Sequence, residues 1–88
     1  MLRISMSEPA GASIQLRLDG QITGRWVKLL RRTCEVQRKK GLGAILDLRN
    51  VSFADRDGIA LLRMLAERGV EILNAPSFIA EQIRRDER

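Results

Sequence analysis

Hydrophobic and polar positions alternate over the first part of the chain. Leu2 to Met6 alternates apolar and polar residues, and Ile14, Leu16 and Leu18 alternate with polar ones. Alternation with a period of two is typical of a β-strand with one buried face. Residues 8–11 between the two segments, Glu-Pro-Ala-Gly, have the composition of a turn. The pattern therefore predicts that the chain begins with a β-hairpin.

The period changes in the next segment, Gly24 to Lys40. On a helical wheel, the apolar and basic residues of this segment separate onto opposite halves. The apolar half consists of Trp26, Val27, Leu29, Leu30, Thr33, Cys34, Val36 and Gln37. The other half carries Glu35 and the cations Arg25, Lys28, Arg31, Arg32, Arg38 and Lys39. We expect an amphipathic helix that ends at Gly41, because glycine readily adopts the left-handed conformation found after helix ends.

A short apolar run follows, from Ala44 to Leu48. It predicts a central strand covered on both faces. We interpret the next segment, residues 50–57, as a loop in which Val51 and Phe53 point the same way.

A second helix is expected to begin at Asp57 or Gly58 and to stop at Gly69. The Asp57 carboxylate is expected to accept hydrogen bonds from the free amides of the first turn. Its charge would also suit the positive end of the helix dipole.

The last elements are a strand and a third helix. Val70 to Leu73 predicts the strand, and Pro76 opens the helix, where a missing amide proton does no harm. Ile79 and Ile83 share the inner face of this helix, and residues 84–88 form a charged tail.

These elements follow one another in the order β-β-α-β-α-β-α and fill a single domain of residues 1–88. A strand, a helix and another strand in succession imply parallel pairing with a right-handed crossover, and the hairpin adds an antiparallel pair. We therefore expect an α/β fold with a mixed four-stranded sheet and about three helices.

Composition removes several kinds of chemistry. The chain has no histidine and one cysteine, Cys34. A Ser-His-Asp triad, a Cys-His pair, an internal disulfide and a zinc finger are therefore impossible, and we predict no enzyme, metal or cofactor. Cys34 is expected to be a small buried thiol. Apolar stretches are too short for a membrane span or a signal peptide, so the expected location is the cytoplasm.

Asp47 is expected at the end of a strand, and Asp55 and Asp57 at the start of the second helix. Ligands often bind at the carboxyl ends of strands in open α/β sheets, so these carboxylates are candidates for a metal or phosphoryl site. We favour a structural interpretation in which Asp57 caps the helix, Asp55 bonds the loop backbone and Asp47 pairs with an arginine. Arg56 supports this view because it would repel a cation.

The net charge of +5 and the basic face of the first helix make phosphate-rich ligands a candidate. Nucleic acid is the less favoured of these ligands. No exposed aromatic residue is expected beside the cations to stack on bases, since Trp26 is assigned to the core.

The second helix has a wider apolar surface than a core needs. Its core-facing side consists of Ile59, Leu61, Leu62, Leu65 and Ala66. Ala60 and Met64 continue the apolar surface toward Arg63 and Glu67. An apolar surface edged by charges indicates a partner-binding face. The alternative is that the first or third helix covers Ala60 and Met64.

The segment from Asp47 to Leu62, DLRNVSFADRDGIALL, resembles the central motif of STAS domains, the anti-sigma factor antagonist family. That motif is an apolar strand, Asp-Leu, a Val-x-Phe-x-Asp turn, two small hydroxyl residues, Gly and an apolar helix. Leu18 to Ile22 is similar to the family's second strand, and Arg68 to Ile72 to its helix-to-strand junction. The resemblance extends over most of residues 14–80.

The resemblance implies a binding module rather than an enzyme. In antagonist members, the start of the second helix binds an anti-sigma kinase, and phosphorylation of a hydroxyl residue after the turn aspartate breaks the complex. Arg56 stands at that position here and Asp57 at the next, so the usual switch is absent. The family usually adds a final strand and helix, and we expect this chain, which ends at Arg88, to lack both.

We therefore predict a STAS-like protein-interaction module in bacterial regulation, with an anti-sigma factor or a kinase-like regulatory protein as its partner. The expected contact residues are Arg56, Asp57, Ala60, Arg63, Met64 and Glu67. The alternative function is binding of an anionic ligand through the basic first helix. That ligand would be a nucleotide, a nucleic acid or a lipid head group, and a membrane would be reached only through a partner, as in a lipid-transport assembly.

The strand at Val70 to Leu73 also bears on assembly. With no further strand beside it, its backbone groups are open to pairing, which predicts a homodimer with a continuous sheet. The alternative is that the third helix, with Phe78, Ile79 and Ile83, folds over this edge.

Overall fold

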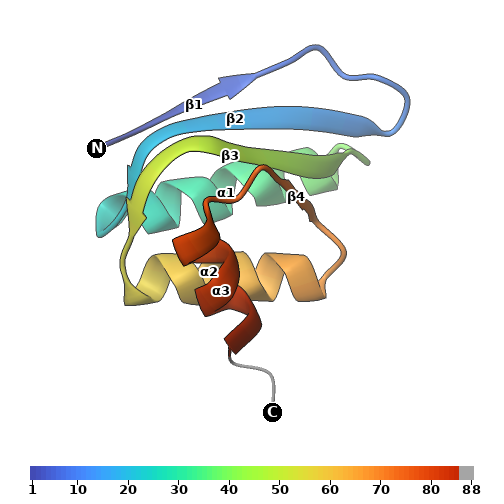
Figure 1. Cartoon of the computed structure of the whole chain (residues 1–88). Coiled ribbons are helices and arrows are strands. Elements are labelled where there is room, and N and C mark those ends of the chain that lie inside the picture. Colours follow the sequence, from blue (N-terminus) through green and yellow to red (C-terminus); the bar gives the residue numbers. More distant parts are fainter. Residues whose placement is uncertain (86–88) are drawn as a thin grey trace.

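The computed structural model describes residues 1–85 and shows the predicted order of elements (Figure 1). The strands are β1 (Leu2–Met6), β2 (Ser13–Ile22), β3 (Gly43–Ala54) and β4 (Glu71–Leu73). The helices are α1 (Arg25–Lys39), α2 (Arg56–Glu67) and α3 (Ser77–Arg85). Of the charged tail expected over residues 84–88, residues 84 and 85 continue α3, and the remainder lies outside the described residues.

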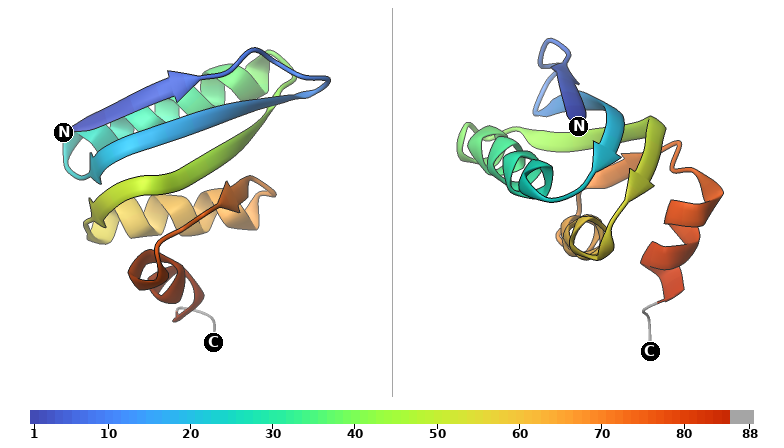
Figure 2. Two further views of the ribbon diagram at one scale, coloured as in Figure 1. Left: turned by 45° about the horizontal axis from the view of Figure 1, so that its top comes forward. Right: turned by 90° about the vertical axis from the view of Figure 1, so that its left-hand side faces the viewer.

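The strands form one mixed sheet in the order β1-β2-β3-β4. β1 and β2 pair antiparallel, with Leu2 opposite Gly20 and Met6 opposite Leu16, which confirms the hairpin. β3 pairs parallel with β2 and with β4, because α1 and α2 carry the chain back between these strands. Figure 2 shows that α1 and α2 cover the same face of the sheet.

The core lies between this sheet face and the helices. In β2, Ile14, Leu16 and Leu18 are buried while Gln15 and Arg17 are exposed, as the alternation predicted. The most deeply buried side chains come from both layers and are Leu16, Leu18, Ile22, Leu30, Leu46, Leu48, Leu62 and Ile79. Burial of these apolar surfaces supplies the main driving force for folding.

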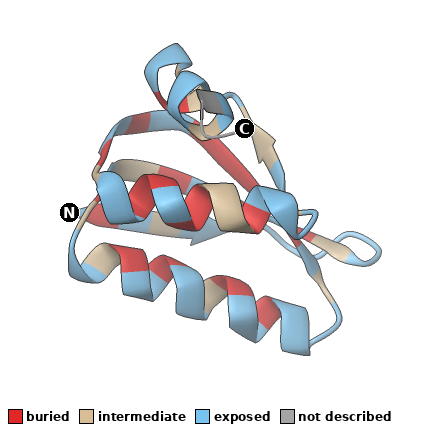
Figure 3. Ribbon diagram, turned by 90° about the horizontal axis from the view of Figure 1, so that it is seen from below, coloured by how far each residue is buried: buried red, intermediate tan, exposed pale blue. Residues whose placement is uncertain are grey.

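α1 buries a narrower strip than the wheel predicted (Figure 3). Leu29 and Val36, which belong to the expected apolar half, are 41% and 43% exposed. The reason is geometric, because a helix on a sheet face is covered only along its line of contact. The buried residues of α1 are Val27, Leu30, Cys34 and Gln37.

β3 is longer than predicted. It continues to Ala54, through the segment expected to be a loop. Val51 lies opposite Gly20 and Phe53 opposite Gln21, so β3 carries one extra residue between them, as in a β-bulge. The bulge separates the two side chains: Val51 is buried and Phe53 is 50% exposed. The expectation that they point the same way is wrong.

α3 packs against α2, on the side of the sheet that ends in β4 (Figure 2). Ile79 is fully buried and Ile83 is half-buried, which confirms the predicted inner face, whereas Phe78 is 41% exposed. β1 and β4 are the two edge strands, and within residues 1–85 β4 pairs only with β3.

Candidate protein-interaction face

The predicted contact residues begin where β3 ends and α2 starts. Asp55 is the N-cap of α2, and its Oδ1 accepts a hydrogen bond from the Gly58 amide at 2.7 Å. Its Oδ2 accepts a hydrogen bond from the Gly24 amide at 3.1 Å, at the start of α1. The Asp55 amide donates to the Ile22 carbonyl at 3.1 Å. One carboxylate thus joins the amino ends of both helices at the carboxyl ends of β2 and β3.

Gly58 is buried directly beneath this junction. A Cβ at this position would lie 2.5 Å from the carbonyl oxygen of Ile22 and 3.1 Å from its Cγ2. The Asp-x-x-Gly spacing therefore has a structural reason. Asp55 caps the helix, and Gly58 lets the end of β2 approach the first turn.

Asp57 does not cap α2, contrary to the prediction. The helix begins at Arg56, one residue earlier than expected, so Asp57 lies inside the first turn with an exposed side chain. Its charge still lies near the positive end of the helix dipole. Asp55 takes the capping position because both helices direct amides at it.

The carboxylates considered as a ligand site have separate roles. Asp47 is 7% exposed and accepts hydrogen bonds from Asn74 Nδ2 at 3.1 Å and from the Arg49 amide at 3.0 Å. These bonds, helped by the charges of Arg49 and Arg17, hold its pKa below the ordinary 3.8 despite burial. Its bonding partners are amides, not the arginine side chain that was predicted. Among residues 1–85, no three His, Cys, Asp or Glu side chains are grouped to hold a metal ion.

The structure divides the six predicted contact residues into two groups. Arg63 and Met64 are half-buried. The other four are exposed on the outer side of α2, and we call them the α2 face: Arg56, Asp57, Ala60 and Glu67.

Arg63 and Met64 make contacts within the protein itself. Arg63 Nη2 donates to the Gln82 carbonyl at 3.1 Å, and its Nε donates to the Ile83 carbonyl at 3.4 Å. Both carbonyls lie in the last turn of α3, where helical partners are lacking. Met64 packs against the core, while Ala60 is exposed. Met64 is therefore partly covered by the fold, whereas Ala60 stays accessible on α2.

Phe53 is an exposed residue that the predicted contact set omits. Its side chain is 50% exposed at the end of β3, two residues before the N-cap of α2. The Val-x-Phe spacing of the motif marks Phe53 in the sequence. That its ring faces outward follows only from the bulge in β3.

The basic residues of α1 are all exposed, as predicted: Arg25, Lys28, Arg31, Arg32, Arg38 and Lys39. The Arg25 guanidinium lies 5.1 Å from the centre of the Trp26 ring, and Trp26 packs against the core. Phe53 and Phe78, the exposed aromatic residues of the described chain, belong to other elements. The cations of α1 are therefore not interleaved with exposed rings that could stack on bases.

Cys34 is buried, as expected, on the inner side of α1. Burial, and to a smaller extent the charge of Glu35, raises the pKa of its thiol to about 11. The thiol is therefore protonated at neutral pH and a poor nucleophile. None of the helices within residues 1–85 has the length and apolarity needed to cross a membrane.

No protein-family model and no curated protein matches this sequence. Solved structures do match its fold. The anti-sigma factor antagonist SpoIIAA in its unphosphorylated form matches with a TM-score of 0.72 and 16% identity, over 94% of this chain and 79% of its own. An anti-sigma factor antagonist STAS domain from Rhodobacter sphaeroides matches with a TM-score of 0.64 and 17% identity, over 83% of this chain and 86% of its own.

A third match is an uncharacterized protein with a SpoIIAA-like fold from Shewanella loihica. Its TM-score is 0.59 at 11% identity, over 85% of this chain and 67% of its own. The four-stranded mixed sheet of this chain and the order of its strands and helices therefore define a SpoIIAA-like α/β fold. More particularly, it is the fold of the STAS domains that the central sequence motif resembles.

Proposed function

We propose that this protein is an interaction module of the anti-sigma factor antagonist type, working in the bacterial cytoplasm by binding rather than by catalysis. Its partner would be an anti-sigma factor or a kinase-like regulatory protein. One observation carries the proposal: the exposed α2 face, which begins in the first turn of α2 and runs along the helix, belongs to a fold shared with SpoIIAA over 94% of the chain.

The α2 face is suited to binding because it is held rigidly. The Asp55 cap and the close approach at Gly58 fix the first turn of the helix against β2. A surface that is already ordered loses little conformational entropy on association. Ala60 offers a flat apolar centre, and the charges of Arg56 and Glu67 orient a partner around it.

Arg56 gives the face a constant charge. An arginine side chain has no hydroxyl group and cannot accept a phosphate as a serine or threonine does. We infer that partner binding here is not controlled by phosphorylation at this position.

The proposal is tested by site-specific crosslinking in the native host. A photoreactive amino acid at Ala60 should capture one partner, identified by mass spectrometry, and the same probe at the distant Ser5 should not. The captured protein is then purified and its affinity measured by titration calorimetry. Charge reversal by Arg56→Glu should weaken binding at least about tenfold, since like charges placed opposite each other repel.

Lys28→Glu on α1 is the matched control, because it makes the same change of charge on another exposed helix face. It should leave the affinity within about twofold. Full affinity of Arg56→Glu for the captured protein would contradict the role of the α2 face.

The second candidate function rests on the six exposed cations of α1. Phosphate contacts made by such a face should produce binding that falls steeply with salt. Titration against anionic vesicles, duplex DNA and single-stranded DNA at two salt concentrations tests this, and absence of binding at low salt excludes it. Lys28→Glu should weaken this binding, whereas Arg56→Glu should not.

A further inference from the structure

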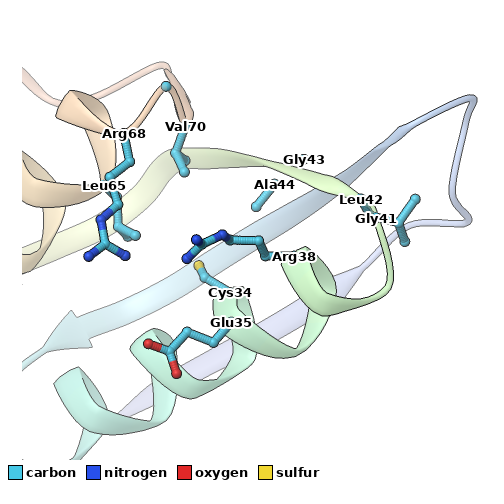
Figure 4. A pocket seen from close by; sticks show the side chains of 11 residues that line it. Cys34, Glu35, Arg38, Gly41, Leu42, Gly43, Ala44, Leu65, Arg68 and Val70 are labelled. Carbon is cyan, nitrogen blue, oxygen red and sulfur yellow. The ribbon is translucent and has the colours of Figure 1, made fainter.

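A cavity of about 470 Å³ opens between α1, α2, the beginning of β3 and the residues that precede β4 (Figure 4). It lies where both helices end, so it is at the opposite end of α2 from Asp55 and Arg56. Its volume is within the range of small-molecule sites, which is roughly 300–1,000 Å³. None of the α2 face residues lines it.

Two helix ends of the same type form the rim of this cavity. Gly41 and Gly69 have positive φ angles of 83° and 95°. The amides of the next residues, Leu42 and Val70, each donate to a carbonyl five residues earlier at 2.9 Å. This is the Schellman arrangement, which satisfies carbonyl groups at a helix end and turns the following apolar residue inward. Those carbonyls are therefore already bonded and do not need a ligand.

The floor of the cavity is apolar and uncharged. Cys34, Ala44 and Leu65 are buried there, and Leu42 and Val70 are half-buried at its sides. Because the pKa of the Cys34 thiol is about 11, this group is neutral at physiological pH. An apolar group of a ligand can therefore displace water from this floor without leaving a charge unsolvated.

Two arginines stand at the mouth. Arg38 from α1 and Arg68 from the end of α2 extend toward each other across the opening (Figure 4). Within residues 1–85, neither guanidinium has a hydrogen-bond or ion-pair partner. Glu35 also lines the rim, and Figure 4 shows its carboxylate apart from both guanidinium groups. The rim thus carries two positive charges and one negative charge.

We propose that this cavity binds an amphipathic monocarboxylate, a molecule with one carboxylate on an unbranched or compact apolar body. The carboxylate lies between Arg38 and Arg68, whose planar guanidinium groups match its two oxygens. The apolar body lies on the floor formed by Ala44, Leu65 and Val70. The net charge of +1 at the rim suits a monoanion. No residue of the α2 face lines this site, and the proposal does not depend on the function proposed for that face.

The arginines have a competing structural role. Cations near the carboxyl end of a helix offset the negative end of its dipole, and Arg38 lies in the last turn of α1. In that case the arginines would stabilise the fold and bind no ligand. Binding measurements on variants separate the two roles.

Decanoate, below its micellar concentration, is the probe. Amide chemical shifts in the ¹⁵N-labelled protein should change saturably at Gly41, Gly69 and Ala44. Arg38→Gln and Arg68→Gln should each weaken binding about tenfold, the usual loss for a hydrogen bond to a charged group. Glu35→Gln should strengthen it, because a nearby negative charge is removed. Decanol, which has the same chain without the charge, should bind more weakly than decanoate.

Arg32→Gln is the matched control, since Arg32 is exposed on the same helix and does not line the cavity. It should leave decanoate affinity unchanged. The proposal is overturned by the absence of saturable shifts at the cavity, by equal weakening in Arg32→Gln, or by equal affinity for decanol. Arg38→Gln should keep its affinity for the partner captured through Ala60, so failure of one proposal leaves the other standing.

Discussion

Asp55 and Gly58 account for the geometry at the amino end of α2. The carboxylate of Asp55 bonds two amides that are 34 positions apart in the chain, from Gly24 to Gly58. Gly58 has no space for a side chain because the Ile22 carbonyl lies against it. These two residues therefore couple the end of β2, the start of α1 and the start of α2 in one place.

Replacement of Gly58 by alanine should destabilise the protein by about 2 kcal/mol, because the added Cβ meets a backbone carbonyl. In an open helical position the same change would stabilise by about 1 kcal/mol. The sign of the change in the free energy of unfolding, measured with urea, therefore tests the close approach. Ala60→Gly at an exposed site of the same helix serves as the control and should cost about 1 kcal/mol. Increased stability of Gly58→Ala would show that the first turn is not held against β2.

Asp47 and Asn74 give the stability of the protein a dependence on acid pH. The hydrogen bond from Asn74 is the largest cause that lowers the pKa of Asp47, so the folded state favours the ionised carboxylate. The resulting stability is present above the unfolded pKa, about 4, and is lost as the pH falls through the lower folded pKa.

Asn74→Gly tests this contribution. Asn74 has a positive φ of 58°, which glycine also adopts, so the variant removes the hydrogen bond without straining the backbone. At pH 7 it should be less stable than the wild type by about 1 kcal/mol. The difference should shrink as the pH is lowered below about 4. An equal difference at pH 7 and at pH 2.5, measured by urea unfolding, would contradict the assignment.

Among the secondary-structure elements, α2 has a buried side and an exposed side. It lies between α1 and α3 and buries Leu61, Leu62 and Leu65 against the sheet (Figure 3). Its outer side carries the α2 face. Arg63 lies at the border between these sides and joins α2 to the last turn of α3.

Arg63→Ala should loosen α3 while leaving α2 intact. The loss of its two hydrogen bonds to the Gln82 and Ile83 carbonyls should speed hydrogen exchange of the α3 amides about fivefold, which corresponds to about 1 kcal/mol. Arg56→Ala is the control, because Arg56 is exposed on the same helix. If both variants leave α3 exchange unchanged, Arg63 does not hold this helix.

At the scale of the whole molecule, the β4 edge of the sheet bears on association, because within residues 1–85 this strand pairs only with β3. β4 is a three-residue edge strand. α3 packs against α2 and does not pair with the backbone of β4. An edge of this kind can pair with the same edge of a second copy. The net charge of +5 opposes such pairing, and salt screens this repulsion.

We therefore predict a weak homodimer through β4. Light scattering over a concentration series should show a mass that rises from 10.0 kDa toward twice that value, and more readily at high salt. Leu73→Lys places a charge in the edge strand and should shift the equilibrium to the monomer. A constant mass near 10.0 kDa at the highest concentration would refute the dimer.

Much of the fold could be predicted because hydrophobic periodicity reports how each segment is buried. The alternation at Ile14, Leu16 and Leu18 predicts one buried face of a strand, and the structure confirms it. The order of strands and helices then restricts the sheet to parallel pairing around β3. These features follow from local sequence, since each depends on residues only a few positions apart.

The details of the candidate site could not be predicted in the same way. The segment Asp55-Arg56-Asp57 offers two capping carboxylates, and the choice depends on the Gly24 amide, which is distant in sequence. Phe53 faces outward because β3 contains an extra residue opposite β2, which only the pairing of the two strands reveals.

The sequence by itself determined the types and order of the elements, the buried thiol, and the absence of histidine chemistry. Only the tertiary structure decided which groups from different elements come together: Arg63 bonds the end of α3, and Arg38 and Arg68 line the same cavity. The physical reason is that periodicity records burial along one element. Hydrogen bonds and charge pairs between elements depend instead on register and crossing geometry, which are set when the sheet and helices pack together.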